Sequence, residues 1–450
     1  MSEARPWPQA PTARRRLITM DGSFTADAAL QRPDRYAFLS AATERRPAIA
    51  RGAGFSFAAA SFGAGAVTVD FTAFDRILAF DAASGIVEME AGARLGALFC
   101  FLTARGFYLP VQPGHFSITV GGAIAADVHG KNPAREGTFL AQVRSLRLFH
   151  PAHGMVEAST TQNGDLFRAT CGGYGLTGVI VSARLEAQPI PGDTLTLAIH
   201  PVATAREGAE RLREWSTTHD LVYAWHDFAR PGVEFGRGAA IVAKFSGKRG
   251  VRTEAALRPS RFSPERRARL PLSLITPWTV RCINRVYSMK LRRSEGPTTL
   301  AAALYPTASS EPYLALFGRS GFHETQAIIP DARYGEYVDE LRALVQRSGV
   351  TIALGVAKPF AGASDHLRFT GDGISLALHV ARDARASAFL AELDRLVIAA
   401  GARPNIIKDS RLPRAIVETA YPDYQQFRAA LRRWDPERLF RSELSARLGL

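Results

Sequence analysis

The stretch Ser117–Asn132 reads SITVGGAIAADVHGKN and combines small residues with a polar end. Gly121 and Gly122 lack a Cβ, so their backbone N–H groups can come close to the phosphate or carbonyl oxygens of a ligand. Short β runs lie on either side, AVTVDF upstream and VRSLRLFH downstream. The pattern predicts an α+β domain in which a glycine-rich loop faces a ligand.

Other glycines lie in separate loops. RGAGFSF contains Gly52 and Gly54 and follows a short β run, and Gly114 lies in PVQPG. GYGLTG has the GxGxxG spacing of a dinucleotide-binding turn, but that turn must leave a strand and open a helix, whereas here a helix precedes and a strand follows. A standard nicotinamide domain is therefore disfavoured. Several loops converging on one long, polyanionic cofactor would explain the glycines together, although each alone also fits a plain tight turn.

The second half of the chain has longer elements. Amphipathic patterns predict helices over 204–220, 330–349 and 383–401, and alternating patterns predict strands over 221–229, 323–330 and 374–381. We expect a separate α+β domain, a sheet covered by helices. The expected boundaries are 1–194 for the first domain, 195–403 for the second, and 404–450 for a C-terminal segment that returns to the first.

Composition excludes several classes of protein. The chain has 450 residues, of which 46% are hydrophobic, and only three cysteines. These cysteines lie far apart, which excludes a disulfide framework and a CxxC metal or redox site. No apolar run approaches the roughly 18 residues that span a bilayer, and the N-terminal residues lack a signal-like apolar stretch. We therefore expect a cytoplasmic protein.

The positive charge is concentrated in one stretch. Residues 244–293 contain fourteen Lys and Arg against two Glu, in a chain whose net charge is +14. This local excess argues against nucleic acid as the partner. The apolar segment LPLSLITPWTV with Trp278 lies within this stretch. Such a segment could lie on the anionic surface of the inner membrane. A solvated surface loop is the alternative, because polybasic stretches are common on soluble faces.

Lys408 and His129 are the polar residues of most interest. Lys408 follows the β run Asn405–Ile407, so an ammonium group at a strand end could offset negative charge on a reduced ring or a substrate alkoxide. His129 lies among small and polar residues and fits either a polar role or a hydrogen-bonded structural imidazole. The ten histidines are scattered, so no metal site is expected. Motifs of hydrolases, kinases and zinc proteases do not occur.

Taken together, several segments resemble one known family. They are RGAGFSF, VTVDF, PVQPGHFSITVGGAIAADVHGKN, DLFRATCGGYGLTGVIVSARLEA, YAWHDFARPGVEFGRGA, IIKDSR and the C-terminal WDPERLFRSELSARL. They are similar to the FAD-dependent decaprenylphosphoryl-β-D-ribose 2′-oxidases of the vanillyl-alcohol-oxidase/p-cresol-methylhydroxylase (PCMH) superfamily. The resemblance extends over nearly the full length, and VGGAIAADVHGKN combined with IIKDSR is its most specific part.

The resemblance implies a two-lobed fold, with a PCMH-type FAD-binding domain and a substrate domain inserted before the C-terminal segment. It also implies FAD bound non-covalently, because Phe55 occupies the place where many members carry a histidine bonded to the flavin. By matching motifs, the implied FAD-binding residues are Ala50, Arg51, Gly52, Ala53, Gly54, Phe55, Ser56, Phe57, Gly114, Thr119, Val120, Gly121, Gly122, Ala126, Asp127, Val128, His129, Ile180 and Asn405.

The implied catalytic residues are Lys408, His129, Tyr305, Gln326 and Lys358. Lys408 would stabilise negative charge at the flavin or the substrate oxygen, and His129 would hold the flavin or the pocket in place. The implied reaction removes a hydride from a secondary alcohol carbon of a sugar and leaves a ketone. With a polyprenyl-phosphate-linked pentose as substrate, a partner NAD-dependent reductase would complete a two-step epimerisation.

Two positions depart from the family pattern. Glu324 stands where the family has its first pocket glutamine, and Leu376 stands where well-known relatives have a pocket cysteine. An added carboxylate disfavours a nearby phosphate unless it is paired. A soluble aldonolactone or alditol oxidase of the same superfamily is therefore an alternative. A non-catalytic protein that docks on membranes or nucleic acid is the alternative from a different class.

Overall fold

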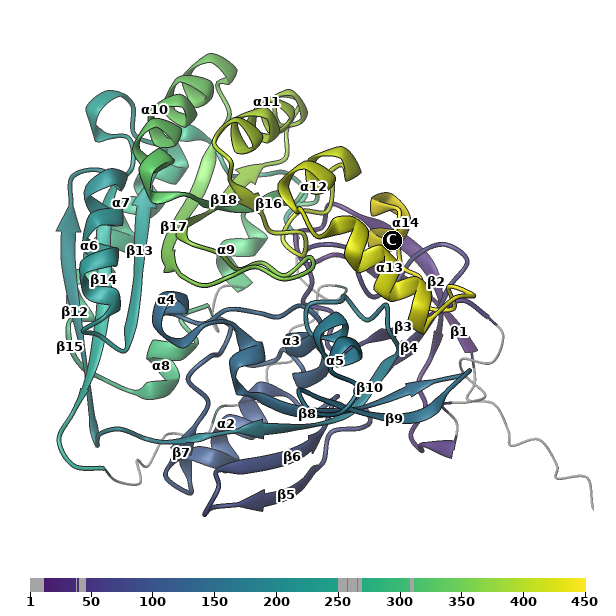
Figure 1. Ribbon diagram of the computed structural model, residues 1–450. Helices are drawn as coiled ribbons and strands as arrows, with labels where there is room; N and C mark the ends of the chain where they lie inside the picture. Colours follow the sequence, from purple (N-terminus) through teal and green to yellow (C-terminus); the bar gives the residue numbers. More distant parts are fainter. Residues whose placement is uncertain are drawn as a thin grey trace, which may run out of the picture.

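The computed structural model describes residues 12–37, 39, 46–249, 257, 265, 269–307 and 311–450. They form two lobes, each built on β-sheet (Figure 1). The sequence RYAFLSAATERR at 35–46 has a helical pattern, but most of it lies outside the described residues. Long parts of the basic stretch 244–293 lie outside them as well.

The first lobe contains two main sheets. One has the order β1-β2-β4-β3 and the other the order β5-β6-β10-β8-β9. The first sheet comprises β1 (Thr12–Ile18), β2 (Thr25–Gln31), β4 (Val67–Asp70) and β3 (Ala48–Arg51). The second comprises β5 (Ile77–Asp81), β6 (Ile86–Glu90), β10 (Val179–Glu186), β8 (Val143–His150) and β9 (Gly154–Ser159). A short pair joins β7 (Phe107–Tyr108) to β11 (Gln188–Pro189).

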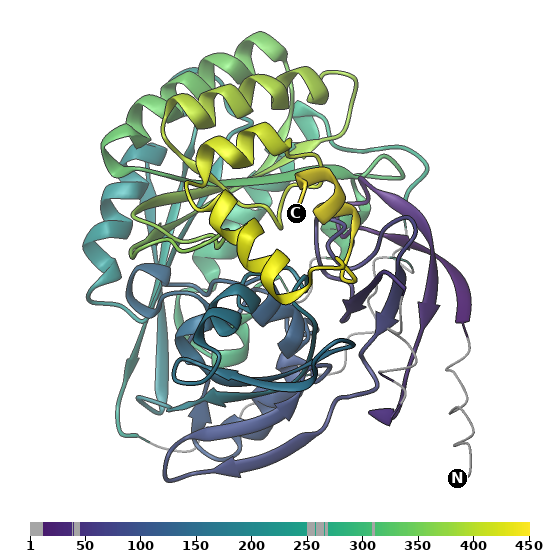
Figure 2. The ribbon, with the colours of Figure 1, turned by 45° about the vertical axis from the view of Figure 1, so that its right-hand side comes forward.

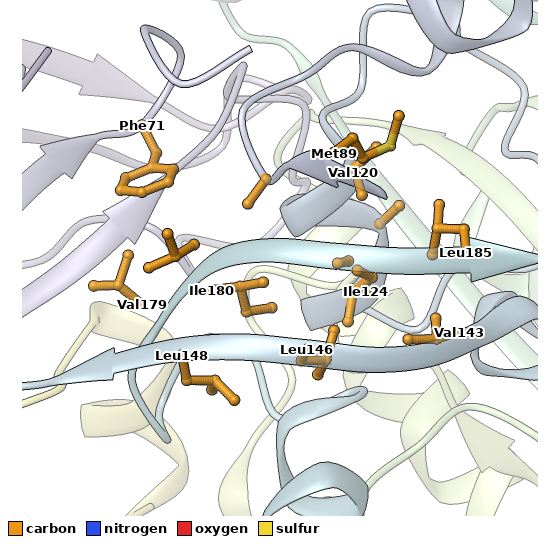
Figure 3. Packing of buried hydrophobic residues seen from close by; sticks show 14 of the residues in the cluster. Phe71, Met89, Val120, Ile124, Val143, Leu146, Leu148, Val179, Ile180 and Leu185 are labelled. Atoms are coloured by element: carbon orange, nitrogen blue, oxygen red, sulfur yellow. The ribbon is translucent and has the colours of Figure 1, made fainter. Parts of the chain in front are cut away.

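Helices of this lobe cover the second sheet. They are α2 (Leu95–Thr103), α3 (Val120–Ala125) and α5 (Gly164–Thr170), with a 3-10 turn at Phe139–Gln142, whereas α4 (Pro133–Glu136) contacts the second lobe. Figure 3 shows Val120 and Ile124 of α3 within the same buried cluster as Leu146, Ile180 and Leu185 from the sheet. Burial of this apolar surface fixes α3, and hence the glycine-rich loop that begins it, on the lobe.

The second lobe is one antiparallel sheet of the order β15-β12-β14-β13-β17-β18-β16-β19. Its strands are β15 (Gly296–Thr298), β12 (Thr194–Val202), β14 (Arg237–Ser246), β13 (Leu221–Asp227), β17 (Ile352–Phe360), β18 (Gly373–Ala381), β16 (Phe322–Ile329) and β19 (Arg403–Pro404). Helices α6 (Ala205–Ser216), α10 (Asp331–Ser348) and α11 (Ala386–Ala399) cover one face (Figure 1). Ala327 and Ile329 of β16 and Leu378 of β18 pack in the core under these helices. Because side chains alternate along a strand, Glu324 and Gln326 point to the opposite face.

The other elements between β13 and β16 are a 3-10 turn at Gly232–Glu234 and the helices α7 (Pro277–Arg293), α8 (Leu300–Leu304) and α9 (Glu311–Ala315). None of the helices in the described part of the chain combines the length and apolar character needed to cross a membrane.

The C-terminal segment packs on residues from the start of the chain. It contains α12 (Arg414–Ala420), α13 (Tyr424–Trp434) and α14 (Glu443–Leu448), which lie at the junction of the lobes (Figure 2). The Ala48 N–H donates to the Leu439 carbonyl at 2.7 Å, and Phe440 is 1% exposed in the core of the first lobe. The late residues thus complete an early core.

One expected strand is absent. The β run predicted at Asn405–Ile407 is a turn, and the strand β19 before it has only two residues. The Asn405 side chain accepts from the Ile407 N–H at 3.2 Å, and the Lys408 N–H donates to the Asn405 carbonyl at 3.1 Å. These local bonds replace ladder bonds, which is a common effect of Asn.

We expect Phe440→Ala to lower the free energy of unfolding by about 3–5 kcal/mol, because it removes a large side chain from a closed core. Urea denaturation would measure the change. Val233→Ala, at a side chain that is 87% exposed, is the matched control and should have little effect. Equal stability of the two variants would show that the C-terminal segment does not contribute to this core.

Candidate active site

Two glycine-containing loops meet in the first lobe. A Cβ added at Gly52 would overlap the Thr119 hydroxyl, and Gly54 has a φ of +79° that favours glycine. Thr119 caps α3, and its Oγ1 accepts from the Gly122 N–H at 3.3 Å. The loop at 52–57 and the start of α3 therefore lie directly against each other.

The residues of this cradle fit FAD. The hydroxyl of Ser117, in the loop before Thr119, is buried and has no hydrogen-bond partner among the described residues, so it is available to a bound group. The Gly122 N–H is already bonded to Thr119 Oγ1, and the same hydroxyl fills the space beside Gly52, so these two glycines serve the close packing of the loops. Within the described residues, no group of three or more His, Cys, Asp or Glu is placed to hold a metal ion.

Some implied FAD-binding residues present no free side chain to a cofactor. Val120 and Ile180 lie in the hydrophobic core. The Asp127 carboxylate accepts from Thr138 Oγ1 at 2.8 Å and from Arg368 Nε at 2.9 Å. The side chains of Val120 and Asp127 are thus occupied, and only the backbone of these residues can contact FAD.

In the sheet of the second lobe, the face that the helices leave uncovered supplies side chains from three neighbouring strands. Glu324 and Gln326 come from β16, Lys358 from β17, and Ser375 and His379 from β18. Glu324 lies directly opposite His379 in the antiparallel pair, and Lys358 lies directly opposite Ser375. Strand register alone therefore groups these polar side chains on one surface.

His129 from the first lobe contacts this surface. Asn405 Nδ2 donates to Gln326 Oε1 at 2.9 Å, which turns the Gln326 amide nitrogen toward His129 Nε2 at 3.1 Å. His129 Nε2 is then the acceptor, and the hydrogen-bond network assigns the ring proton to Nδ1, which lies 3.3 Å from the Gly130 carbonyl. Burial, with Lys358 and Lys408 nearby, lowers the pKa of His129 well below its usual value, so the imidazole is neutral.

Lys358 and Lys408 act on this histidine, and Lys131 acts on Lys358 in turn. Lys358 Nζ donates to the Gly130 carbonyl at 2.9 Å and lies 3.3 Å from His129 Nδ1. Burial, followed by repulsion from Lys131 and Lys408, lowers the pKa of Lys358 well below its usual value. Burial and Lys408 lower the pKa of Lys131 to about 8. The pocket thus disfavours the charge on two of its lysines.

Lys408 is the lysine with a counter-charge. Its Nζ donates to Glu324 Oε1 at 2.8 Å and lies 4.1 Å from the centroid of the Phe57 ring. Glu324 is 5% exposed; burial alone would raise the pKa of its carboxyl, but Lys408 and His379 hold it at about 2. The Glu324 carboxyl is therefore ionised at neutral pH, and its contact with Lys408 links the sheet of the second lobe to the loop at 52–57 through Phe57.

Tyr305 lies at another edge of the site. Its hydroxyl donates to Gln112 Oε1, and the neighbouring Thr307 hydroxyl donates to the Gly114 carbonyl. Both contacts join the segment after α8 to the loop that contains Gly114. Tyr305 thus lies beside an implied FAD loop, and its hydrogen bond goes to Gln112 rather than to His129 or Lys408.

The structure brings Lys408, His129, Gln326, Lys358 and Asn405 into one connected network. Leu376 does not belong to it, contrary to the expectation that it replaces a pocket cysteine, because it packs in the core under the helices. The sequence argument missed Lys131, His379 and Tyr313. Lys131 lies two residues after His129 in HGKN, and the alternation of ISLALHVA placed His379 on one face of a strand, so both signals were present.

Comparisons with known proteins agree with this geometry. Residues 36–159 match the family model described as an FAD binding domain. An uncharacterized protein of Streptomyces coelicolor is 32% identical over 77% of this chain and 96% of its own length. A decaprenylphosphoryl-β-D-ribose oxidase of Mycolicibacterium smegmatis is 29% identical over 90% of both chains. An L-gulono-1,4-lactone dehydrogenase of Mycobacterium tuberculosis is 25% identical over 90% of both chains.

The chain belongs to the PCMH-type FAD-binding oxidoreductases. It is an FAD-dependent oxidoreductase with the two-lobed α+β fold of that family, as the resemblance implied. The alternative of a non-catalytic docking protein is therefore not supported.

We expect Gly52→Ala to lower the affinity for FAD by about tenfold or more, a loss equivalent to about 1.4 kcal/mol, because the new methyl group overlaps Thr119 Oγ1. The ratio of flavin to protein absorbance after purification measures the loss, and circular dichroism reports whether the fold is kept. Gly164→Ala is the control, since a Cβ there has ordinary contacts at 3.7 Å. Full FAD occupancy in Gly52→Ala would remove this loop from the cofactor site.

Proposed function

We propose that the protein oxidises a secondary hydroxyl of a sugar that carries an anionic group, with a polyprenyl-phosphate-linked pentose as the favoured substrate. This proposal depends most on the grouping of Lys131, Lys358 and Lys408, two of which act on His129, with Glu324 paired to Lys408. The relative from Mycolicibacterium smegmatis, named for a decaprenylphosphoryl-ribose substrate, supports the same class.

The lysines favour an anionic ligand for an electrostatic reason. Lys131 is 4% exposed, and burial first, then repulsion within the group, lowers the pKa of both Lys131 and Lys358. A buried cation without a counter-charge is costly, and an anion bound beside it removes much of that cost. A phosphate on the substrate is the group that these two side chains would accept best.

Each polar residue has a role in the proposed reaction. Bound FAD supplies the acceptor for the hydride that leaves the carbinol carbon. Lys408 donates a hydrogen bond to the substrate oxygen as negative charge develops on it. Gln326 and Asn405 hold the neutral His129 ring in a fixed orientation. The product is a ketone, so an NAD-dependent reductase is the proposed partner that would complete an epimerisation.

Anaerobic bleaching of the flavin tests this proposal. Polyprenyl-phosphopentoses should bleach the protein, and free alditols and lactones should do so much more slowly. Lys408→Met should keep FAD yet slow bleaching by about a hundredfold, in the range found when one donor to a developing oxyanion is removed. Lys248→Met, at an exposed lysine, is the control. Bleaching by none of the sugars, or unchanged bleaching of Lys408→Met, would contradict the proposal or the role of Lys408.

A soluble aldonolactone or alditol oxidase is the second candidate. Glu324 favours it, because a carboxylate is well suited to accept hydrogen bonds from neutral sugar hydroxyls. The similarity to an L-gulono-1,4-lactone dehydrogenase points the same way. Fast bleaching by a lactone or alditol, without bleaching by the phosphopentoses, would select this candidate.

The helix α7 offers a surface for a lipid-linked substrate. Exposed apolar side chains gather on it and on the segment before it, namely Leu270, Leu272, Leu274, Trp278, Val286, Tyr287 and Met289. Exposed Arg285, Lys290 and Arg293 lie among them. An apolar surface interleaved with cations is complementary to an anionic bilayer. We propose that this surface, the α7 face, rests on such a membrane.

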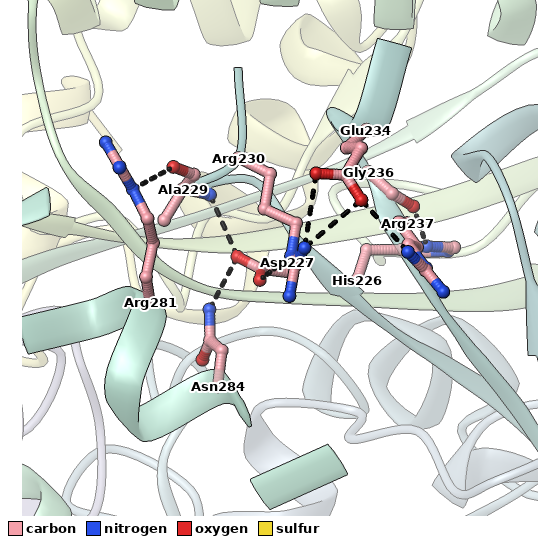
Figure 4. A network of polar contacts seen from close by, with 9 residues as sticks. All are labelled: His226, Asp227, Ala229, Arg230, Glu234, Gly236, Arg237, Arg281 and Asn284. Carbon is pink, nitrogen blue, oxygen red and sulfur yellow. Dashed lines mark hydrogen bonds and ion pairs between the residues drawn. The ribbon is translucent and has the colours of Figure 1, made fainter. Parts of the chain in front are cut away.

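The inner side of α7 is firmly attached. Figure 4 shows Asn284 and Arg281 reaching the end of β13: Asn284 Nδ2 donates to Asp227 Oδ1 at 2.7 Å, and Arg281 Nε donates to the Ala229 carbonyl at 3.2 Å. Ile275, just before α7, packs in the same apolar cluster as Phe57, the residue under Lys408. The α7 face is therefore held close to the structure that forms the site, which would bring a membrane near the pocket.

We expect the double variant Trp278→Ala/Met289→Ser to lose most binding to vesicles that contain anionic lipid, because it removes apolar contact area from the α7 face. Flotation of vesicles measures binding, and added salt should weaken binding of the unmodified protein. Leu78→Ser, at a 43% exposed leucine of the first lobe, is the control. Equal flotation of the unmodified protein and the double variant would contradict the membrane proposal without affecting the flavin chemistry.

A further inference from the structure

A chain of hydrogen bonds ends at Lys408. Tyr313 Oη lies 3.1 Å from His379 Nδ1, and His379 Nε2 lies 3.1 Å from Glu324 Oε2. Glu324 Oε1 accepts from Lys408 Nζ at 2.8 Å. Each group in the chain can donate to the next one. The Tyr313 hydroxyl donates to His379 Nδ1, the His379 Nε2–H donates to one oxygen of the Glu324 carboxylate, and the Lys408 ammonium group donates to the other oxygen.

The protein holds each member of this chain in place. Glu324 and His379 are directly paired across β16 and β18, so strand register sets their approach. Tyr313 stacks on His379 with an angle of 25° between the rings, and Phe322 packs against the same imidazole. Burial, and then Glu324, raise the pKa of Tyr313 well above its usual value, so its hydroxyl keeps the proton that it donates.

The chain changes what Lys408 can bind. A free ammonium group would attract the anionic part of a substrate, but Glu324 cancels that charge at 2.8 Å. A phosphate placed at Lys408 would also lie near the Glu324 carboxylate, and like charges at such separations repel strongly in a partly buried site. A neutral hydroxyl meets no such penalty and can accept from Lys408.

We propose that Tyr313, His379 and Glu324 are positioning residues that fix Lys408 as half of an ion pair, so that Lys408 receives a neutral hydroxyl and the anionic group goes to Lys131 and Lys358. This assignment rests on the proposed function, since it concerns the same sugar site. It divides the pocket into a neutral end and an anion-binding end.

Binding of inorganic phosphate to the FAD-loaded protein tests the division without any turnover. Glu324→Gln removes the negative charge, keeps the shape, and introduces the residue found in the family that this chain resembles. Phosphate affinity, measured by calorimetry and by the change in flavin absorbance, should rise about tenfold, a modest value for a unit charge at close range. Damage to a site lowers affinity, so a gain cannot come from a merely structural role.

Two further variants separate the ends of the pocket. Lys408→Met added to Glu324→Gln should abolish the gain, because the released ammonium group is what attracts the phosphate. Lys131→Met should weaken phosphate binding in the protein with Glu324 intact. The proposal would be overturned if Glu324→Gln bound phosphate no more tightly than the unmodified protein, or if neither protein bound phosphate. Failure of every sugar to bleach the flavin would instead contradict the proposed function and leave these phosphate affinities as they are.

The role of His379 has its own test. His379→Leu removes the donor to Glu324 and should slow flavin reduction by about tenfold, because Lys408 loses its fixed position. His379→Gln keeps an N–H donor and should restore most of the rate. The same rate in His379→Leu and the unmodified protein would remove His379 from the chain, and so would a His379→Gln variant no faster than His379→Leu.

Discussion

Alternation of side chains along β16, β17 and β18 is the constraint on which the active site depends. Helices α6, α10 and α11 bury one face of the sheet, so every second residue is committed to an apolar core. The other face is left to Glu324, Gln326, Lys358 and His379. A slip of one residue in register would exchange the two sets, and the burial of the apolar set therefore also fixes the polar one.

Charge is distributed unevenly over this polar face. Glu324 pairs with Lys408, while among the described residues neither Lys131 nor Lys358 forms an ion pair with a carboxylate. The neutral His129 contacts Lys358 and is oriented by Gln326. One sheet surface can thus present different chemistry to two parts of a single substrate.

The sequence predicted much of this arrangement. The α+β class, the glycine loops at 52–57 and 117–122 and the amphipathic helices follow from local patterns, and the FAD family is confirmed by the comparisons.

Local reasoning failed where one residue changes the geometry. A solvated surface loop was the alternative reading of LPLSLITPWTV, yet its Pro277 occupies the first turn of α7 behind the cap of Thr276. Asn405 formed a turn where a strand was expected. The partner of Glu324 could not be read from the sequence, because residues 330–372 separate β16 from β18 and the pairing depends on the register between them.

The packing of the C-terminal segment has a consequence for biosynthesis. Tyr421, Phe427 and Leu444 share a buried cluster with Ile49 and Ala58, which border the FAD loop. The ribosome makes the second lobe in full before these late residues emerge. The apolar surface of the early strands therefore stays partly uncovered until then. Capture of the dinucleotide by the nascent polypeptide is therefore postponed until translation reaches the final helices.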